Sequence, residues 1–266
     1  MCDTMFVDFL ITLGDFMKFS AARLSGNAIK FIAAFCMLCD HMGVILFPQY
    51  KFLRIIGRIA FPIFAFMIAE GCRYTKNKLK HFLTVGGFAL AIQLGFFIFN
   101  KEMALREINV FVTFTFSIMM IYALQAFYEN LFDKEAKIQK KILSGAVFLA
   151  LVMAVYYVSF YINFDYNFYG AMIPVIASLF MMPKNCSVDW LKKLDNKYMH
   201  ILMLGIGVAL MVFPSPIKYK RFALLSLFIL LFYSGKRGKL KTKYFFYVFY
   251  PLHLVILEGI YILMHI

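Results

Sequence analysis

Polar stretches long enough to form a soluble domain are missing from this sequence of 266 residues. Charged residues make up only 16% of the chain, against about 25% in a soluble domain. Hydrophobic residues make up 63%, above the roughly 45–50% of a soluble domain. This composition is typical of a chain that crosses a membrane several times, because each crossing needs about 20 apolar residues.

The sequence also lacks a cysteine pattern that would predict a disulfide framework. Its five cysteines are odd in number, and Cys36 and Cys39 lie inside the first apolar stretch. No second pair accompanies these two, so we expect small core side chains there and no metal site. The N-terminus carries Asp3 and Asp8 where a signal peptide has basic residues, so we expect it to be retained.

Apolar stretches of membrane-spanning length recur along the chain. Residues 1–23 precede them and combine an apolar helical face with an acidic one, which predicts an amphipathic helix on the membrane surface. We expect an all-α polytopic membrane protein with about nine transmembrane helices, in which residues 24–266 form a single integral domain. The predicted spans are 27–47, 52–72, 79–100, 108–128, 142–163, 167–183, 198–214, 217–234 and 244–265.

Basic residues gather on one side of these spans. Nineteen of the 28 Lys and Arg residues precede the first span or follow the second, fourth, sixth and eighth, whereas six lie on the opposite side. The positive-inside rule then predicts a bacterial inner-membrane protein with a cytoplasmic N-terminus and an external C-terminus. These topology signals, lying beside anionic lipid, also explain the net charge of +14, so we expect no nucleic-acid partner.

Ionisable residues inside the first two spans are the strongest functional signal, because they are expensive in hydrocarbon. Asp40 and His41 lie at the same outer level as Arg54 and Arg58. Adjacent helical residues point about 100° apart, so we expect Asp40 to pair with Arg58 or Arg54 rather than to orient His41. A neutral His41 imidazole could accept a proton from an amine or hydroxyl, or could simply bond between helices.

Further polar residues are weaker candidates. His253 follows a proline that breaks the last span, so it is a second catalytic or binding group or a bond to the broken turn. Asn109 and Thr113 lie one turn apart and either line the same cavity or bond between helices. Asp165, in an outer loop, either contributes to the same site or is a solvated loop residue. Glu70 lies at the cytoplasmic end of its span, which predicts a separate inner cluster.

Motifs along most of the chain resemble those of the TraX family. They occur in order between about residues 24 and 260, as Lys30-x-Ile32-Ala33, Asp40-His41-Met42-Gly43, Leu53 to Phe66, Glu70-Gly71-x-Arg73-x-Thr75-Lys76, Asn109-Val110-Phe111-x-Thr113-Phe114, Asp165-Tyr166 with Gly170, and Phe249-Tyr250-Pro251-x-His253-Leu254. The resemblance implies an integral membrane acyltransferase with acetyl-CoA or another acyl-CoA as co-substrate. The founding activity of the family is acetylation of the N-terminus of a conjugative pilin.

TraX proteins are in turn similar to the acyltransferase-3 superfamily, whose first span carries Arg-x-Ile-Ala and ends in a catalytic histidine. Lys30 stands where that arginine is expected, and His41 falls where the histidine does. Lysine cannot make the two-pronged contact of an arginine with a phosphate or carboxylate, so the role of Lys30 stays open.

The residues and the resemblance together predict a division of roles. His41 deprotonates the acceptor, Arg58 or His253 stabilises the oxyanion, and Asp40 holds the arginine in place. Arg73 and Lys76 either hold the CoA phosphates or only set topology. Further candidates for substrate contacts are Arg54, Glu70, Asn109, Asp165 and Tyr250.

The expected acceptor is an amine or hydroxyl of an envelope component, either a pilin-like protein or a glycan. Two other function classes fit polar residues inside a membrane: a transporter, or a non-catalytic partner in envelope or pilus assembly. Transporters often consist of paired halves with matching broken helices, and this sequence shows no such internal repeat.

Overall fold

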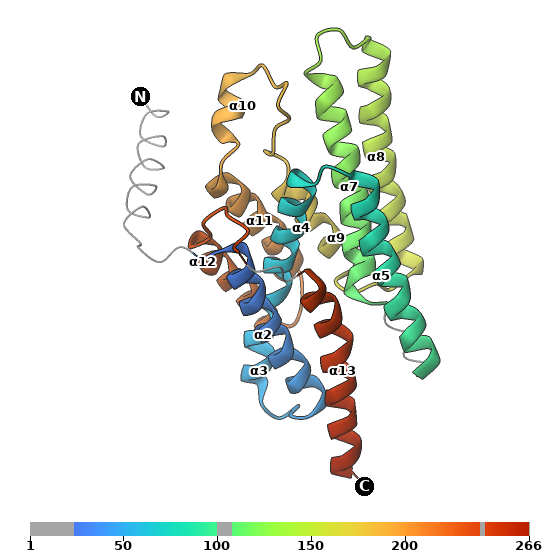
Figure 1. Ribbon diagram of the computed structural model, residues 1–266, viewed down its shortest axis with the longest axis vertical. Coiled ribbons are helices and arrows are strands. Elements are labelled where there is room, and N and C mark those ends of the chain that lie inside the picture. The colour runs from blue at the N-terminus through green and yellow to red at the C-terminus, as the bar shows by residue number, and fades with distance from the viewer. Residues whose placement is uncertain (1–23, 100–107, 240–242, 266) are drawn as a thin grey trace.

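The computed structural model describes residues 24–99, 108–239 and 243–265 (Figure 1). These residues form an all-α fold, as the sequence predicts, with two isolated bridges, Leu24 to Tyr233 and Ile108 to Phe164, and no strand within the described ranges. The predicted surface helix at 1–23 lies outside the described residues. That residues 24–266 form a single domain stays a prediction.

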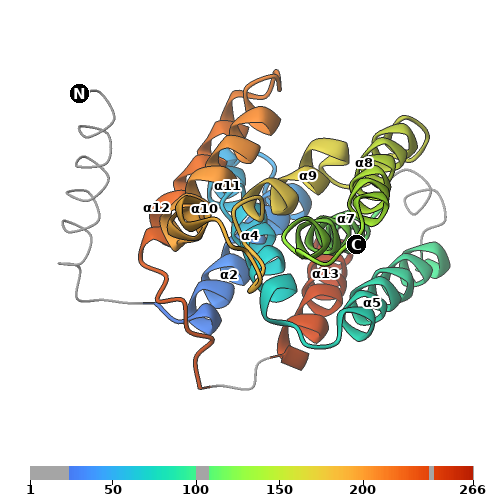
Figure 2. The same cartoon turned by 90° about the horizontal axis from the view of Figure 1, so that it is seen from above.

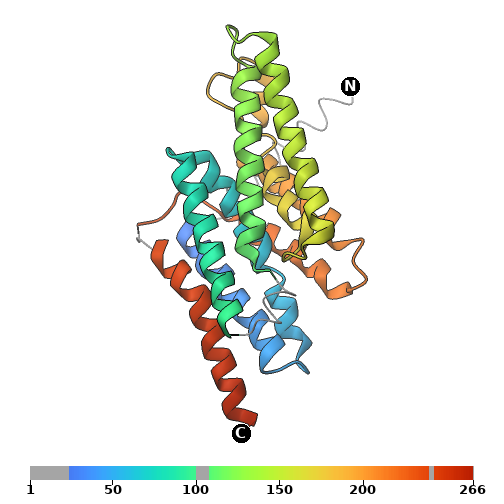
Figure 3. The ribbon, with the colours of Figure 1, turned by 90° about the vertical axis from the view of Figure 1, so that its right-hand side faces the viewer.

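Six helical segments of the described chain are long and apolar enough to cross a membrane. Seen from the side, α5, α7, α8 and α13 run roughly along the long axis of the molecule (Figure 3). The protein is therefore a multi-pass membrane protein. The helices that make up these segments are α2 (Gly26–Ile45), α3 (Lys51–Gly57) with α4 (Ala60–Tyr74), α5 (Lys78–Phe99), α7 (Val110–Leu131), α8 (Ile138–Tyr161) and α13 (Lys243–His265).

The predicted spans 167–183, 198–214 and 217–234 form shorter elements, so the count of nine is not confirmed. In the first of these, the helix ends at Ala177, where both the backbone N–H and the hydroxyl of Ser178 bond back to carbonyls of the last turn. In the last, a 3-10 helix replaces the first half of the segment. These elements are α9 (Asn167–Ala177), α10 (Asp189–Leu194), α11 (Lys197–Val212), η1 (Lys218–Leu224) and α12 (Leu225–Leu231).

The second predicted span is divided between α3 and α4 at Arg58 and Ile59. Pro62 lies in the first turn of α4, where it has no N–H to donate to the carbonyl of Arg58 four residues earlier. A continuous helix would also press the proline ring against that carbonyl. The break therefore follows from the sequence, and it places Arg58 at a junction between two helices.

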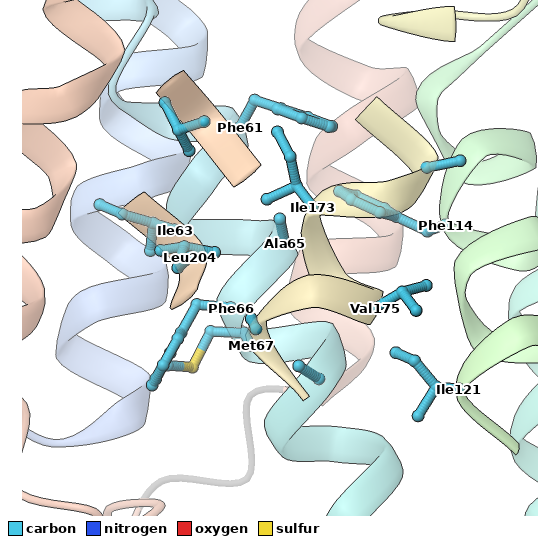
Figure 4. Packing of buried hydrophobic residues seen from close by; sticks show 14 of the residues in the cluster. Phe61, Ile63, Ala65, Phe66, Met67, Phe114, Ile121, Ile173, Val175 and Leu204 are labelled. Atoms are coloured by element: carbon cyan, nitrogen blue, oxygen red, sulfur yellow. The ribbon is translucent and has the colours of Figure 1, made fainter. Parts of the chain in front are cut away.

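Helix α4 lies at the centre of the molecule, surrounded by α2, α7, α9 and α11 (Figure 2). Its side chains Ile63, Ala65 and Phe66 are fully buried and meet side chains of α7, α9 and α11 (Figure 4). Lipid is as apolar as these residues, so close packing rather than removal from water stabilises the contact. Gly207 of α11 shows this, because its missing side chain lets the helix approach Ile173 of α9.

Candidate functional site

Asp40 of α2 forms ion pairs with both Arg54 and Arg58. The carboxylate oxygen Oδ2 accepts a hydrogen bond of 2.9 Å from Arg54 Nη1, and Arg58 Nη2 donates to both carboxylate oxygens. The three side chains are 13%, 24% and 8% exposed, respectively. The predicted pairing is therefore confirmed, and it involves both arginines rather than one.

Two glycines let α2 and α3 approach closely enough for this pairing. Gly57 lies directly against the side chain of Asp40. A Cβ atom on Gly43 would lie 2.9 Å from the Cβ of Leu53 and 3.3 Å from the Cδ of Arg54. Because real Cβ atoms essentially never come within 3.0 Å of another side chain in this way, the close approach of α2 and α3 depends on the absence of side chains at both positions.

His41 and His253 contact each other through their ring nitrogens. The Nδ1 atom of His41 lies 2.7 Å from Nε2 of His253, and the ring centroids lie 4.9 Å apart. Helices α2 and α13, which carry these histidines, and α3, which carries Arg54, lie at the end of the molecule that holds the C-terminus (Figure 1). The sequence marks both histidines as candidates, and the structure joins them into a pair beside the ion pairs of Asp40.

The second ring nitrogen of His253 is also engaged. Its Nδ1 atom lies 2.7 Å from the backbone carbonyl oxygen of Phe249, one turn earlier on α13. The carbonyl that loses its donor to Pro251 belongs to Tyr247, four residues before the proline. His253, which is only 5% exposed, therefore does not fill the bond that the proline breaks.

A second polar cluster lies at the other end of α4, separate from the first as predicted. Arg73 Nη1 and Nη2 donate to the two carboxylate oxygens of Asp195 at 2.6 and 2.9 Å. His200 Nε2 lies 3.0 Å from Asp195 Oδ1. The hydroxyl of Tyr233 donates to Glu70 at 3.2 Å. Arg73 and Glu70 thus have partners within the protein that the sequence did not predict.

The pKa of Asp195 is lowered from its ordinary value. Burial alone would raise this pKa, but the hydrogen bonds and charges of His200 and Arg73 outweigh it. Asp195 was missed because the sequence alone does not distinguish a paired carboxylate in a loop from a solvated one. His200 and Tyr233 were missed because both lie near the ends of predicted spans.

Asn109 and Thr113 bond between elements of the fold. Asn109 accepts the cap bond of α7 from Phe111 N and donates to Gln93 Oε1 at 2.8 Å. Thr113 donates to the backbone oxygen of Asp165 at 2.6 Å. These bonds match the alternative of bonding between elements.

Two predicted residues differ in their distance from the histidine pair. Tyr250 is 7% exposed, and its ring lies 5.8 Å from that of His253. It is therefore part of the surroundings of the pair. Lys76 is exposed and follows the C-terminal end of α4, near the inner cluster. Within the part of the chain that the structure describes, no group of three or more His, Cys, Asp or Glu residues could hold a metal ion.

Comparison with known proteins gives the family. The TraX protein family model matches residues 25–261. This chain belongs to the TraX family. A probable fimbrial assembly protein, FimC of serogroup H1 from Dichelobacter nodosus, is 24% identical over 248 residues, covering 88% of this chain and 94% of that protein. An uncharacterized protein from Rickettsia prowazekii (strain Madrid E) is 39% identical over 54 residues, covering 20% of this chain and 21% of that protein. No solved structure matches the chain.

Proposed function

We propose that this protein is a membrane acyltransferase that transfers an acyl group, acetyl in the founding activity of its family, from acyl-CoA to an amine or hydroxyl of an envelope acceptor. Membership of the TraX family supports this function. The observation that carries it is the contact of His41 with His253 beside two arginines inside membrane-spanning helices. Such polar groups are expensive in a membrane and mark working sites.

His41 is the base in the proposed reaction. The acceptor nitrogen or oxygen attacks the carbonyl carbon of the thioester, and its proton passes to the imidazole of His41. The bond from carbon to sulfur then breaks, and the imidazolium returns the proton to the CoA thiolate. The products are the acylated acceptor and free CoA, with no net change in the protein.

Arg54 is the better of the two arginines to stabilise the oxyanion. Arg58 is 8% exposed, and its Nη2 atom donates to both oxygens of Asp40, so it holds the carboxylate in place. Arg54 is three times as exposed, at 24%, and reaches Asp40 through Nη1 alone. Its remaining N–H donors are the ones that can meet the negative charge of the transition state. The oxyanion role that the sequence assigns to Arg58 or His253 therefore passes to Arg54 in this proposal.

We assign the entry of acyl-CoA to the end of the molecule where Lys76 lies. The positive-inside rule supports a cytoplasmic position for this end, on the side where acyl-CoA is made. Arg73 is held by Asp195, which leaves Lys76 as the better of the two predicted contacts for the CoA phosphates. His41 lies about 22 Å along α2 from its first residue, so the thioester must extend deep between the helices.

The acceptor is a pilin-like protein in this proposal. The name of the Dichelobacter relative, which refers to fimbrial assembly, supports this choice over a glycan. The same name favours a second candidate, a partner in pilus assembly that carries out no reaction. The two functions differ in whether free CoA is released.

Release of CoA thiol by the purified protein tests the proposal. The protein in detergent is mixed with acetyl-CoA and a pilin-derived peptide that has a free N-terminus. Free CoA thiol is measured, and the mass of the peptide is determined by mass spectrometry. We expect acceptor-dependent CoA release and one added acetyl group. His41→Ala should abolish both, whereas His265→Ala, on the exposed end of α13, should not. The same assay is repeated with glycan acceptors. If the protein binds the peptide but releases no CoA with either kind of acceptor, the non-catalytic role in pilus assembly would be favoured.

A further inference from the structure

We propose that His253 is a positioning residue that holds His41 in the tautomer with its proton on Nδ1 and a free electron pair on Nε2. The catalytic meaning of this arrangement rests on the proposed function, but the tautomer itself does not. The hydrogen bonds of the two rings join four atoms in series: the carbonyl oxygen of Phe249, the two nitrogens of His253 and Nδ1 of His41.

The direction of the series is fixed at one end. A backbone carbonyl oxygen can only accept a hydrogen bond, so Nδ1 of His253 must carry the hydrogen of the bond to Phe249. A neutral imidazole has one N–H, so Nε2 of His253 is then an acceptor. The bond of 2.7 Å between the rings therefore takes its hydrogen from Nδ1 of His41. The single N–H of His41 is used, and its Nε2 atom keeps a free electron pair.

The surrounding charges favour the neutral state of both rings. Asp40, beside His41 in the sequence, is one carboxylate shared by two guanidinium groups, Arg54 and Arg58. An imidazolium would add a third positive charge in a region of low dielectric, where such a charge is costly. Both rings are therefore neutral, and each carries one N–H. The order of donors and acceptors described above follows from this.

The second ring nitrogen of His41 keeps its electron pair for an incoming proton. Among the hydrogen bonds of the described residues, His41 makes the one to His253 through Nδ1, and Nε2 takes part in none. A proton accepted at Nε2 turns Nδ1–H into a donor with a positive charge, and its bond to His253 becomes stronger. His253 thus supports the base both before and after proton transfer, as an orienting partner does in other histidine-dependent sites.

The bond between the rings also links α13 to α2, so a purely structural role must be separated from a positioning role. His265 provides an internal control for this purpose. It lies on α13 as His253 does, and its Nδ1 atom bonds the carbonyl oxygen of Tyr261 one turn earlier, at 2.8 Å. Unlike His253, His265 does not contact a histidine of another helix among the described residues.

Nitrogen NMR of the protein, labelled with ¹⁵N in the histidine rings, tests the tautomer without any assay of activity. His41→Gln and His253→Gln variants assign the signals. We expect Nδ1 of His41 to be protonated and Nε2 to have the shift of an unprotonated nitrogen, with His253 also protonated on Nδ1. A proton on Nε2 of His41, or a doubly protonated His253, would overturn the proposal even if the protein proves to be an acyltransferase.

Two substitutions at His253 test the positioning role in the transfer reaction. His253→Phe keeps a ring stacked on Phe249 but has no acceptor, whereas His253→Gln retains an amide oxygen that can accept from His41. We expect kcat to fall about 10- to 100-fold in the Phe variant, as when the outer partner of a metal-bound histidine is lost, with KM for acetyl-CoA unchanged. The Gln variant should regain most of the activity, and His265→Phe should match the unaltered protein.

The NMR spectra of the same variants decide the outcome. The Phe variant should show the proton of His41 shifted toward Nε2, and the Gln variant should show it on Nδ1. Equal activity and an unchanged tautomer in the Phe variant would exclude the positioning role. An inactive unaltered protein that shows the expected tautomer would instead remove the proposed function and leave the tautomer standing.

Discussion

Gly57 of α3 lies in direct contact with the side chain of Asp40 on α2, and a Cβ atom at this position would overlap the carboxylate. The Asp40 side chain cannot move aside easily, because its carboxylate is held by Arg54 and Arg58. The close approach of the two helices and the charge pairing of the site are therefore one structural feature.

Gly57→Ala should displace Asp40 and disrupt both ion pairs. We expect acyl transfer to fall at least about 100-fold, since misplacement by about 1 Å costs this much in oriented sites. The measurement is kcat for CoA release, alongside the melting temperature in detergent. Gly87→Ala on α5 is the matched control, because nothing lies within 4 Å of its added Cβ. Equal activity of the two variants would show that the position of Asp40 does not matter for the reaction.

Removing the carboxylate of Asp40 should destabilise the protein by about 3–5 kcal/mol, because it leaves the buried guanidinium of Arg58 unpaired. Asp40→Asn is compared with Asp189→Asn, which removes an exposed carboxylate paired with Lys192 at 3.5 Å. Exposed pairs of this kind contribute about 0–1 kcal/mol. Thermal unfolding in detergent measures both effects. Asp40→Asn combined with Arg58→Gln should recover part of the loss, and no recovery would contradict the pairing as the cause.

The Asp40 pairing was predictable from the sequence because a carboxylate and two arginines at one membrane depth have few other ways to reduce their cost. His41 and His253 were each identified, but their contact was not, since 212 residues separate them and no periodicity relates one helix to the other. The bonds of Asp195 to Arg73 and of Tyr233 to Glu70 were missed because Asp195 lies in a loop and Tyr233 at the end of a predicted span.

The helical class of the fold followed from composition, but the lengths of the later helices did not. Hydropathy recognises an apolar segment without showing whether it forms one helix or two short ones. The segment 217–234 illustrates this, because it consists of a 3-10 helix followed by a short α-helix. In contrast, the break after Gly57 has a local cause in Pro62.

Lys76→Ala should raise KM for acetyl-CoA about 3- to 10-fold and leave kcat unchanged, which is the loss expected for one exposed contact to a phosphate. Lys51→Ala, at the other end of the span that α3 and α4 form, is the control with the same change of charge. Initial rates over a range of acetyl-CoA concentrations give both constants. A similar KM in both variants would remove Lys76 from the donor site.

The ion pair of Asp195 should make stability depend on pH. The pKa of Asp195 in the folded protein lies below its ordinary value of 3.8 because of His200 and Arg73, in spite of burial. The stabilisation is therefore complete above this ordinary value and is lost as the pH falls through the lowered pKa. The difference in melting temperature between the unaltered protein and Asp195→Asn should stay constant above about pH 5 and shrink as the pH falls through 3.8 toward the lowered pKa. A difference that stays constant through this fall as well would show that the carboxylate charge contributes nothing.

The number of membrane crossings can be measured at the short elements. If α9, α11 and the pair η1 and α12 all cross, the loops between them alternate between the two sides of the membrane. In a protein whose native cysteines are replaced, Ser187→Cys and Lys236→Cys should react with an impermeant maleimide only after the cells are opened. Ser215→Cys should react in intact cells. If Ser215→Cys is protected like the other two, α11 and the pair η1 and α12 do not cross separately, and the protein has fewer spans than the sequence predicts.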